Sequence, residues 1–100
     1  MEKTNKLSSH IKNILCSLPD SPGIYQFFNK ERKIIYIGKA KNLKKRITSY
    51  FSKKYEYRKL FHLVRSIADI KIIIVETELD ALLLENNLIK KYQPRYNIEL

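Results

Sequence analysis

Apolar and polar residues alternate along the chain with two different periods, which together predict four helices and three strands. Apolar side chains three or four positions apart indicate helices, and short runs rich in aromatic and β-branched residues indicate strands. The helices are predicted over residues 8–18, 42–51, 57–68 and 77–92, and the strands over residues 24–28, 33–37 and 70–75.

Capping residues mark where several of these helices begin and end. Ser8 or Ser9, Asn42 and Thr77 stand at three predicted helix starts. Their side-chain oxygens can accept a hydrogen bond from a backbone amide in the first helical turn. Thr77 is followed by an acid three residues later, as in a capping box. Pro94 has no amide hydrogen and is expected to end the last helix.

The three strands predict a small sheet. The short polar turn at residues 29–32 makes the first two strands an antiparallel hairpin. Strand alternation places Tyr25 and Phe27 on one face of the first strand. In the second strand it places Ile34, Tyr36 and Gly38 on a common face. The branched run at 70–75 is bounded by charges, which favours a central strand.

The predicted fold class is therefore α+β: a three-stranded, mainly antiparallel sheet flanked by helices. A chain of 100 residues fits one small domain, predicted over residues 1–100. Apolar residues make up 44% of it and charged residues 30%, which excludes a disordered chain.

The helix at 57–68 is expected to bury Tyr57, Leu60, Phe61, Val64 and Ile67, which stand at helical spacing.

Two further features limit the class of protein. Cys16, the only cysteine in the chain, lies in an apolar stripe with Ile11 and Leu15 and is predicted to be a core residue. No run of the sequence is long and apolar enough to span a membrane, and the N-terminus lacks the apolar region of a signal peptide. We therefore expect a cytoplasmic protein with no membrane partner.

Charge gives the first indication of function. Twenty Lys and Arg against ten Asp and Glu give a formal net charge of +10. Residues 39–59 concentrate nine of the basic residues and contain a single acid, Glu56. A local basic surface on a small domain indicates a nucleic acid partner, although a solubilising surface has the same composition.

Glu85 is the most informative single residue. On a helical wheel it falls at the middle of an apolar arc. That arc is formed by Ala81, Leu82, Leu84, Leu88, Ile89 and Tyr92. A carboxylate among apolar neighbours costs several kcal/mol unless something compensates its charge. A bound cation and a structural Arg or Lys are the two alternatives, and the wheel does not separate them.

Two more segments suggest a site for phosphate. A predicted strand ends at Gly38, which permits close approach of a ligand, and Lys39 follows at the entry to a helix. Arg46 and Tyr50, four residues apart on that helix, are neighbours on one of its faces. Taken alone, this pair is more typical of packing than of a site.

Together these residues resemble a known family. The motif halves Gly23-Ile24-Tyr25 and Tyr36-Ile37-Gly38, followed in order by Lys39, Arg46, Tyr50, Glu85 and Asn97, are similar to the GIY-YIG nuclease superfamily. Within it, the runs at 35–43, 84–92 and 94–97 resemble the N-terminal domains of the UvrC family, which take part in bacterial nucleotide excision repair.

The resemblance implies a role for each matching residue. Glu85 corresponds to the carboxylate that binds one divalent metal ion, Mg²⁺ or Mn²⁺. Tyr36 corresponds to the tyrosine that assists the attacking water, and Arg46 to the arginine that stabilises charge on the phosphate. The remaining catalytic positions correspond to Tyr25, Lys39, Tyr50 and Asn97.

The resemblance also implies the substrate and partners. We expect an endonuclease domain that makes the 3′-side incision in damaged double-stranded DNA, as a monomeric part of a longer protein that works with UvrB. The expected DNA-binding residues are Lys39, Lys41, Lys44, Lys45, Arg46, Lys53 and Lys54. Two alternatives remain. One is a non-catalytic nucleic acid binding module with this fold. The other is a nuclease domain of a shorter UvrC-like homologue, or one fused to another polymerase or exonuclease module.

Overall fold

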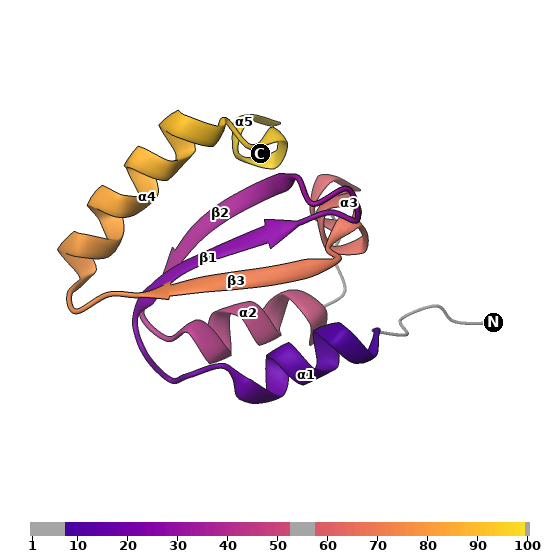
Figure 1. Ribbon diagram of the computed structural model, residues 1–100, viewed down its shortest axis with the longest axis horizontal. Helices are drawn as coiled ribbons and strands as arrows, with labels where there is room; N and C mark the ends of the chain where they lie inside the picture. Colours follow the sequence, from indigo (N-terminus) through magenta and orange to yellow (C-terminus); the bar gives the residue numbers. More distant parts are fainter. Residues whose placement is uncertain (1–7, 53–57, 100) are drawn as a thin grey trace.

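The fold is a three-stranded antiparallel sheet between two layers of helices (Figure 1). The computed structural model describes residues 8–52 and 58–99. Helices α1 and α2 cover one face of the sheet and α4 lies over the other (Figure 1). Helix α5 lies beside the edge strand β2, and α3 stands at one end of the strands. In chain order the elements are α1 (Ser9–Ser17), β1 (Gly23–Phe28), β2 (Ile34–Ala40), α2 (Leu43–Ser52), α3 (Arg58–Ser66), β3 (Asp69–Ile74), α4 (Glu78–Tyr92) and α5 (Arg95–Glu99).

The predicted fold class and the three predicted helix caps are confirmed. Ser8 accepts a hydrogen bond from the Ile11 amide, and Thr77 accepts one from the Asp80 amide. The Asn42 side chain accepts one from the Lys45 amide at 2.9 Å. These caps satisfy amide hydrogens that would otherwise lack partners at each helix start.

The prediction of the central strand was wrong. The strand order is β2-β1-β3, so β1 is central and β3 is an edge strand. Ile24, Tyr25 and Phe27 of β1 are almost fully buried, whereas Ile74 of β3 is 60% exposed. A continuous apolar run indicates burial on the two faces of a strand, but it does not report whether both edges are paired.

A β-bulge also corrects the predicted faces of β2. The register pairs Phe27 with Tyr36 but Phe28 with Ile34, so Ile35 is an additional residue on β2. Ile35 and Tyr36 therefore pack on the α1–α2 side, while Ile34 packs on the α4 side. Simple alternation predicted that Ile34 and Tyr36 share a face of the sheet. This prediction was wrong, because they lie on opposite faces.

Each face of the sheet carries its own core. On the α1–α2 side, the buried cluster joins the sheet to Ile11, Leu43, Ile47 and Leu63. On the α4 side, a smaller cluster is built from Ile24, Ile37 and Ala81, with Leu84, Leu88 and Ile89 half-buried against it. Helix α4 is thus anchored along one narrow stripe.

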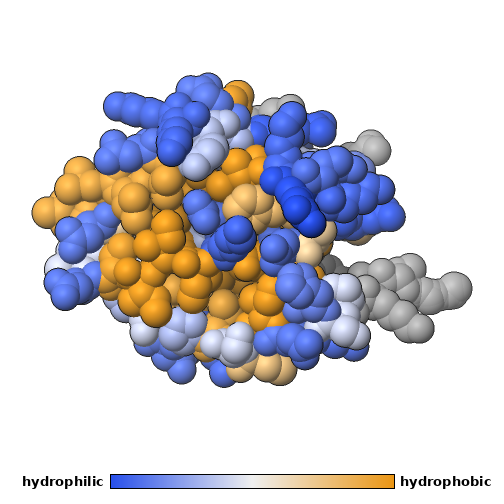
Figure 2. Space-filling model, in the orientation of Figure 1, coloured by the Kyte–Doolittle hydropathy of each residue, from blue (hydrophilic) through white to orange (hydrophobic). Residues whose placement is uncertain are grey.

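Three helix faces differ from their predictions. Cys16 is exposed and not part of the core. Leu63 of α3 and Ile67, just after it, are buried, while Phe61 is 44% exposed. Tyr57 lies outside the described residues. Leu82 and Tyr92, predicted on the buried arc of α4, are exposed. Figure 2 shows the resulting apolar surface over α4 and the neighbouring end of β3. None of the described helices could cross a membrane.

Helix α5 was not predicted. Gln93 closes α4 in the left-handed conformation (φ 48°) and donates its amide to the Ile89 carbonyl. Pro94 then precedes the five residues of α5, and its carbonyl accepts from the Asn97 amide at 3.1 Å. Proline is preorganised for a helix start. It therefore ends one helix and begins the next.

We expect Gly38→Ala to destabilise the domain. Gly38 is paired with Tyr25 across the sheet, and a Cβ atom at Gly38 would overlap the Tyr25 ring and hydroxyl. Such overpacking costs about 1–3 kcal/mol. Urea denaturation would measure the loss, with Lys41→Ala at an exposed position as control. An unchanged unfolding midpoint for Gly38→Ala would contradict the contact.

Candidate functional site

Three of the predicted site residues form one hydrogen-bonded group beneath the sheet. Tyr25 from β1 and Tyr50 from α2 join their hydroxyl oxygens at 2.8 Å. Arg46, one helical turn before Tyr50, donates from Nε to Tyr25 Oη and from Nη2 to Tyr50 Oη, each at 3.4 Å. Its guanidinium also lies 5.1 Å from the centre of the Tyr50 ring. The side chain is thereby held in one orientation.

Tyr36 joins this group from the edge strand β2. Its ring centre lies 6.2 Å from that of Tyr25 and 6.5 Å from that of Tyr50. Its hydroxyl also interacts with that of Tyr50. The structure therefore brings together Tyr25, Tyr36, Arg46 and Tyr50, which the sequence places on three different elements.

Burial governs the ionisation of the tyrosines. It raises the pKa of the Tyr36 hydroxyl to about 12, although Arg46 acts in the opposite direction. It also raises the pKa of Tyr25 and of Tyr50. The Tyr25 hydroxyl, as a hydrogen-bond partner, raises the pKa of Arg46. Near neutral pH the group consists of three neutral phenols and one guanidinium cation.

Glu85 approaches from the other side of the sheet. It lies on α4, one turn beyond the buried Ala81, and is half-buried, less than its position on the wheel predicted. Burial raises the pKa of its carboxyl group, while Lys39 on β2 lowers it. The Glu85 charge also acts on the Tyr36 hydroxyl. Glu85, Lys39 and Tyr36 therefore belong to one electrostatic site.

The carboxylate of Glu85 has no structural ion pair within the described part of the chain. The ion pairs found there join His10 to Asp69 and Lys41 to Glu78. The structural Arg or Lys that could have explained Glu85 is therefore not found among these residues.

Asn97 takes a different place from the other site residues. Its Oδ1 accepts from the Ile37 amide at 2.8 Å, and its Nδ2 donates to the Ile37 carbonyl at 2.9 Å. The carboxamide thus pairs with the free edge of β2 as another strand would. Asn97 fixes the residue next to Tyr36, and its hydrogen bonds go to backbone and not to the tyrosines or Arg46.

A cleft of about 650 Å³ opens beside these residues. One wall carries Lys39, Lys41, Lys45 and Arg46, and the other is the first turns of α4. Lys41 and Glu78 face each other across it at 3.7 Å. Sequence reasoning missed Glu78 and the α4 wall because nothing local connects residues 41 and 78. Lys44 is also exposed, and Lys53 and Lys54 lie outside the described residues.

Comparisons with known proteins agree on one family. The family model described as "UvrC-like GIY-YIG domain" matches residues 21–98. UvrABC system protein C of Bacteroides thetaiotaomicron is 59% identical over 99% of this chain, and that of Bacteroides fragilis is 60% identical over 95%. This chain spans 16% of the length of each of these relatives.

Solved structures give the same result. The GIY-YIG N-terminal endonuclease domain of UvrC from Thermotoga maritima, bound to magnesium as its catalytic divalent cation, has a TM-score of 0.79 and 39% identity. The match covers 90% of this chain and 98% of that one. A point mutant of the same domain, also bound to its cation, matches with the same TM-score.

The fold and the site define a GIY-YIG nuclease domain, a phosphodiester hydrolase. More specifically, this chain belongs to the UvrC-like GIY-YIG domain family. The family membership that the sequence motifs indicated is confirmed.

Replacing Asn97 should loosen the sheet edge. Asn97→Ala removes two hydrogen bonds and leaves the Ile37 amide and carbonyl without these partners, so we expect a loss of about 1–3 kcal/mol. Asn97→Asp keeps an acceptor for the amide but sets a carboxylate oxygen against the Ile37 carbonyl, so it should lose at least as much. Asn87→Ala, at an exposed position on α4, is the control. Urea denaturation measures all three, and equal stability of Asn97→Ala and Asn87→Ala would refute the role.

The buried tyrosines predict a loss of stability in alkali. Because the folded-state pKa of Tyr36 exceeds the ordinary value of 10, its contribution is fully present below about pH 10 and is lost as the pH rises towards about 12. The hydroxyl is partly exposed, so we expect about 1–2 kcal/mol from it.

Denaturation at a series of pH values measures this dependence. Tyr36→Phe should reduce it, while Tyr25 and Tyr50 maintain the remainder. Tyr92→Phe, which removes the hydroxyl of an exposed tyrosine, is the matched control. Identical profiles for the parent and Tyr36→Phe would exclude Tyr36 as the source.

Proposed function

We propose that this domain cuts damaged double-stranded DNA by metal-assisted hydrolysis and makes the 3′-side incision of bacterial nucleotide excision repair. The observation that carries the proposal is Glu85: a half-buried carboxylate without an ion pair to any described residue, beside Lys39 and across from Tyr36. A domain that only binds nucleic acid has no use for this costly arrangement.

The donor set around Glu85 fits a hard divalent cation. Among the described residues, no group of three or more His, Cys, Asp and Glu side chains could form a metal cage. A metal at Glu85 would therefore complete its coordination with water and substrate oxygens. Mg²⁺ and Mn²⁺ suit such a site because Mg²⁺ retains several waters and both prefer oxygen ligands. When bound, the ion supplies a Lewis acid for the phosphate and the leaving oxygen.

The basic side chains stabilise charge on the phosphate. Arg46 is held by Tyr25 and Tyr50, so its guanidinium needs little reorganisation to meet the developing charge. Lys39 adds a second positive charge at the exposed end of β2. Tyr25 and Tyr50 thus serve by orienting Arg46, and Asn97 serves by fixing the strand that carries Tyr36.

Tyr36 orients the attacking water. Burial outweighs the effect of Arg46 and raises the pKa of the Tyr36 hydroxyl to about 12. Near neutral pH its hydroxyl can donate to and accept from a water molecule but is a weak base. Its phenolate would become accessible only when bound positive charge lowers that pKa.

The role proposed for the domain in a longer protein rests on its similarity to the UvrABC system protein C relatives. The domain would act as the monomeric endonuclease part of a longer cytoplasmic repair protein, on DNA presented by UvrB. Phosphates of that DNA would meet Lys39, Lys41, Lys44, Lys45, Arg46, Lys53 and Lys54 of the basic run at 39–59. Of these, Lys39, Lys41, Lys45 and Arg46 line the cleft.

We expect Glu85→Gln to abolish incision and leave the fold intact, because the amide keeps the shape of the side chain but removes the charge that holds the cation. Glu76→Gln, which removes the same charge at an exposed position before α4, is the matched control. Nicking of lesion-bearing duplex DNA with Mg²⁺ and UvrB measures activity, and Mn²⁺ titration calorimetry measures metal binding.

The two variants separate nuclease from binding module. Activity equal to the parent in a folded Glu85→Gln variant would remove the carboxylate from the mechanism. Absence of Mn²⁺ binding and of nicking by the parent chain would favour a module that only binds nucleic acid.

A further inference from the structure

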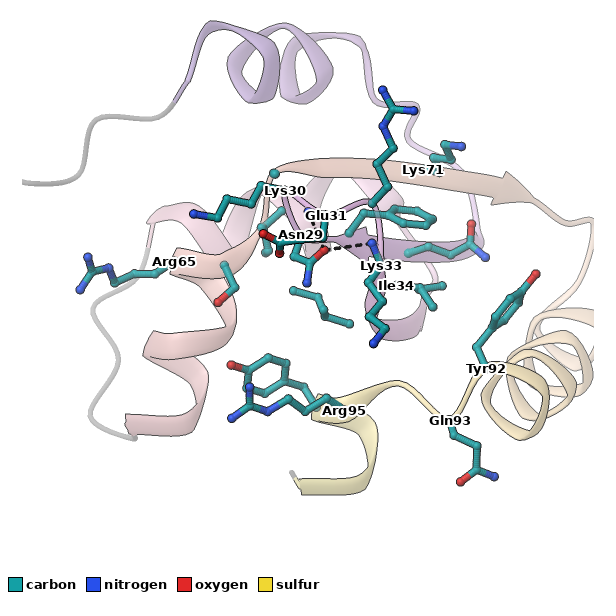
Figure 3. A pocket seen from close by; sticks show the side chains of 18 residues that line it. Asn29, Lys30, Glu31, Lys33, Ile34, Arg65, Lys71, Tyr92, Gln93 and Arg95 are labelled. Atoms are coloured by element: carbon teal, nitrogen blue, oxygen red, sulfur yellow. Dashed lines mark hydrogen bonds between the residues drawn. The ribbon is translucent and has the colours of Figure 1, made fainter.

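A second concave surface lies at the opposite end of β2 from the cleft. A cavity of about 1210 Å³ opens where the β1–β2 turn, the end of α3 and the junction of α4 with α5 meet. Figure 3 shows its lining side chains, and we call it the hairpin-end pocket. None of the predicted site residues lines it, so the proposed reaction leaves it unexplained.

The pocket is strongly basic. Its lining includes a single acid, Glu31, against six cations: Lys30, Arg32, Lys33, Arg65, Lys71 and Arg95. All six lie outside the basic run at 39–59. Lys33 points from the turn toward α5, where Arg95 lies (Figure 3). Figure 2 shows strongly hydrophilic side chains over the end of the molecule where α3 lies.

Five of these six cations have no ion pair with a described carboxylate, namely Lys30, Arg32, Lys33, Arg65 and Lys71. Three of the six cations lie over aromatic rings: Lys71 over Phe28 at 5.3 Å, Arg65 over Phe61 at 5.4 Å and Arg95 over Tyr96 at 5.2 Å. Ring contacts orient a cation without cancelling its charge, so the pocket keeps a concentrated positive potential.

The backbone of the β1–β2 turn gives an independent indication that the pocket has a function. Asn29 Oδ1 accepts from the amides of Glu31 and Lys33 at 3.0 and 2.9 Å, which fixes the turn. Arg32 then adopts φ 65°. Glycine or asparagine takes this left-handed conformation at lower cost than arginine. Arginine therefore occupies a position where the turn itself favours another residue, as expected where a side chain serves function.

We infer that the hairpin-end pocket is a second binding site for the phosphate backbone of DNA. The inference rests on the proposed function in one respect: the ligand is the same DNA that is cut beside Glu85. The cations, the Gln26 amide group and the Tyr92 hydroxyl are donors of the kinds that contact phosphates in protein–DNA complexes.

The spacing of the two sites suits one DNA molecule. Ile34 lines the pocket and Lys39 lines the cleft. Five strand residues separate them by about 17 Å. This length corresponds to roughly five base pairs at 3.4 Å per step. A single duplex can therefore reach both sites, and the pocket would fix its direction across the scissile phosphate.

The salt dependence of DNA binding tests this inference. The variant Arg32→Gly/Lys33→Gln removes two pocket charges, and its glycine should relieve the backbone cost at residue 32, so the fold is retained. Fluorescence anisotropy with short duplex DNA gives log K against log salt. We expect the slope to fall in magnitude by about 1.8, or about 0.9 for each lost phosphate contact. Lys12→Gln, at an exposed position on α1, should leave the slope unchanged.

Two outcomes would overturn the inference. A slope equal to that of the parent chain would show that the pocket touches no phosphate. Loss of binding to a poly-glutamate peptide, with the DNA slope unchanged, would assign the pocket to an acidic protein partner.

Hydrolysis of bis(p-nitrophenyl) phosphate separates this inference from the proposed function, because that small diester cannot bridge the two sites. The pocket variant should hydrolyse it with Mg²⁺ at the parental rate, whereas Glu85→Gln should not. If the parent chain fails to hydrolyse it and the DNA slope still falls in the pocket variant, the nuclease proposal fails and the second DNA site stands.

Discussion

The pairing of the Asn97 carboxamide with the Ile37 backbone is the constraint on which the site depends. β2 is an edge strand, and an edge amide or carbonyl covered by a helix must find a partner or lose free energy. Asn97 supplies a donor and an acceptor at the required spacing. The contact ties α5, and through Gln93 and Pro94 also α4, to the strand that carries Tyr36. The positions of Glu85 on α4 and Tyr36 on β2 are therefore fixed relative to each other, although the two side chains lie on opposite sides of the sheet.

Beneath the sheet, the site also obeys the rule that buried polar groups need partners. Three phenolic hydroxyls in an apolar layer would be costly alone, but they bond to one another and to Arg46. Because the partners are neutral, the arrangement keeps the guanidinium charge available at the cleft. A carboxylate in place of Tyr25 or Tyr50 would hold Arg46 more tightly and cancel the charge that a phosphate requires. Tyr25 and Tyr50 thus pack in the core and at the same time orient the Arg46 guanidinium.

Much of this could be predicted from the sequence, and the exceptions share a cause. Local signals predicted the caps at Asn42 and Thr77, the hairpin and the anomalous Glu85. Long-range pairing decided the rest: which strand is central, the bulge that separates Ile34 from Tyr36, and the burial of Leu63 instead of Phe61. The resemblance to the family assigned Asn97 to the site, but the sequence did not show which residue it contacts. Its hydrogen-bond partner, Ile37, lies sixty residues away in the chain. The roles of the site residues remain predictions.

The distribution of charge links the site to the rest of the surface. Acids are sparse around both concave surfaces: Glu78 is the acid that lines the cleft, where it meets Lys41, and Glu31 is the acid that lines the hairpin-end pocket. A polyanion approaching either end of β2 therefore meets positive potential, whereas the site between them holds the Glu85 carboxylate. Since that carboxylate repels phosphate, the basic surfaces must offset the repulsion from both ends, and a cation at Glu85 would reverse it locally.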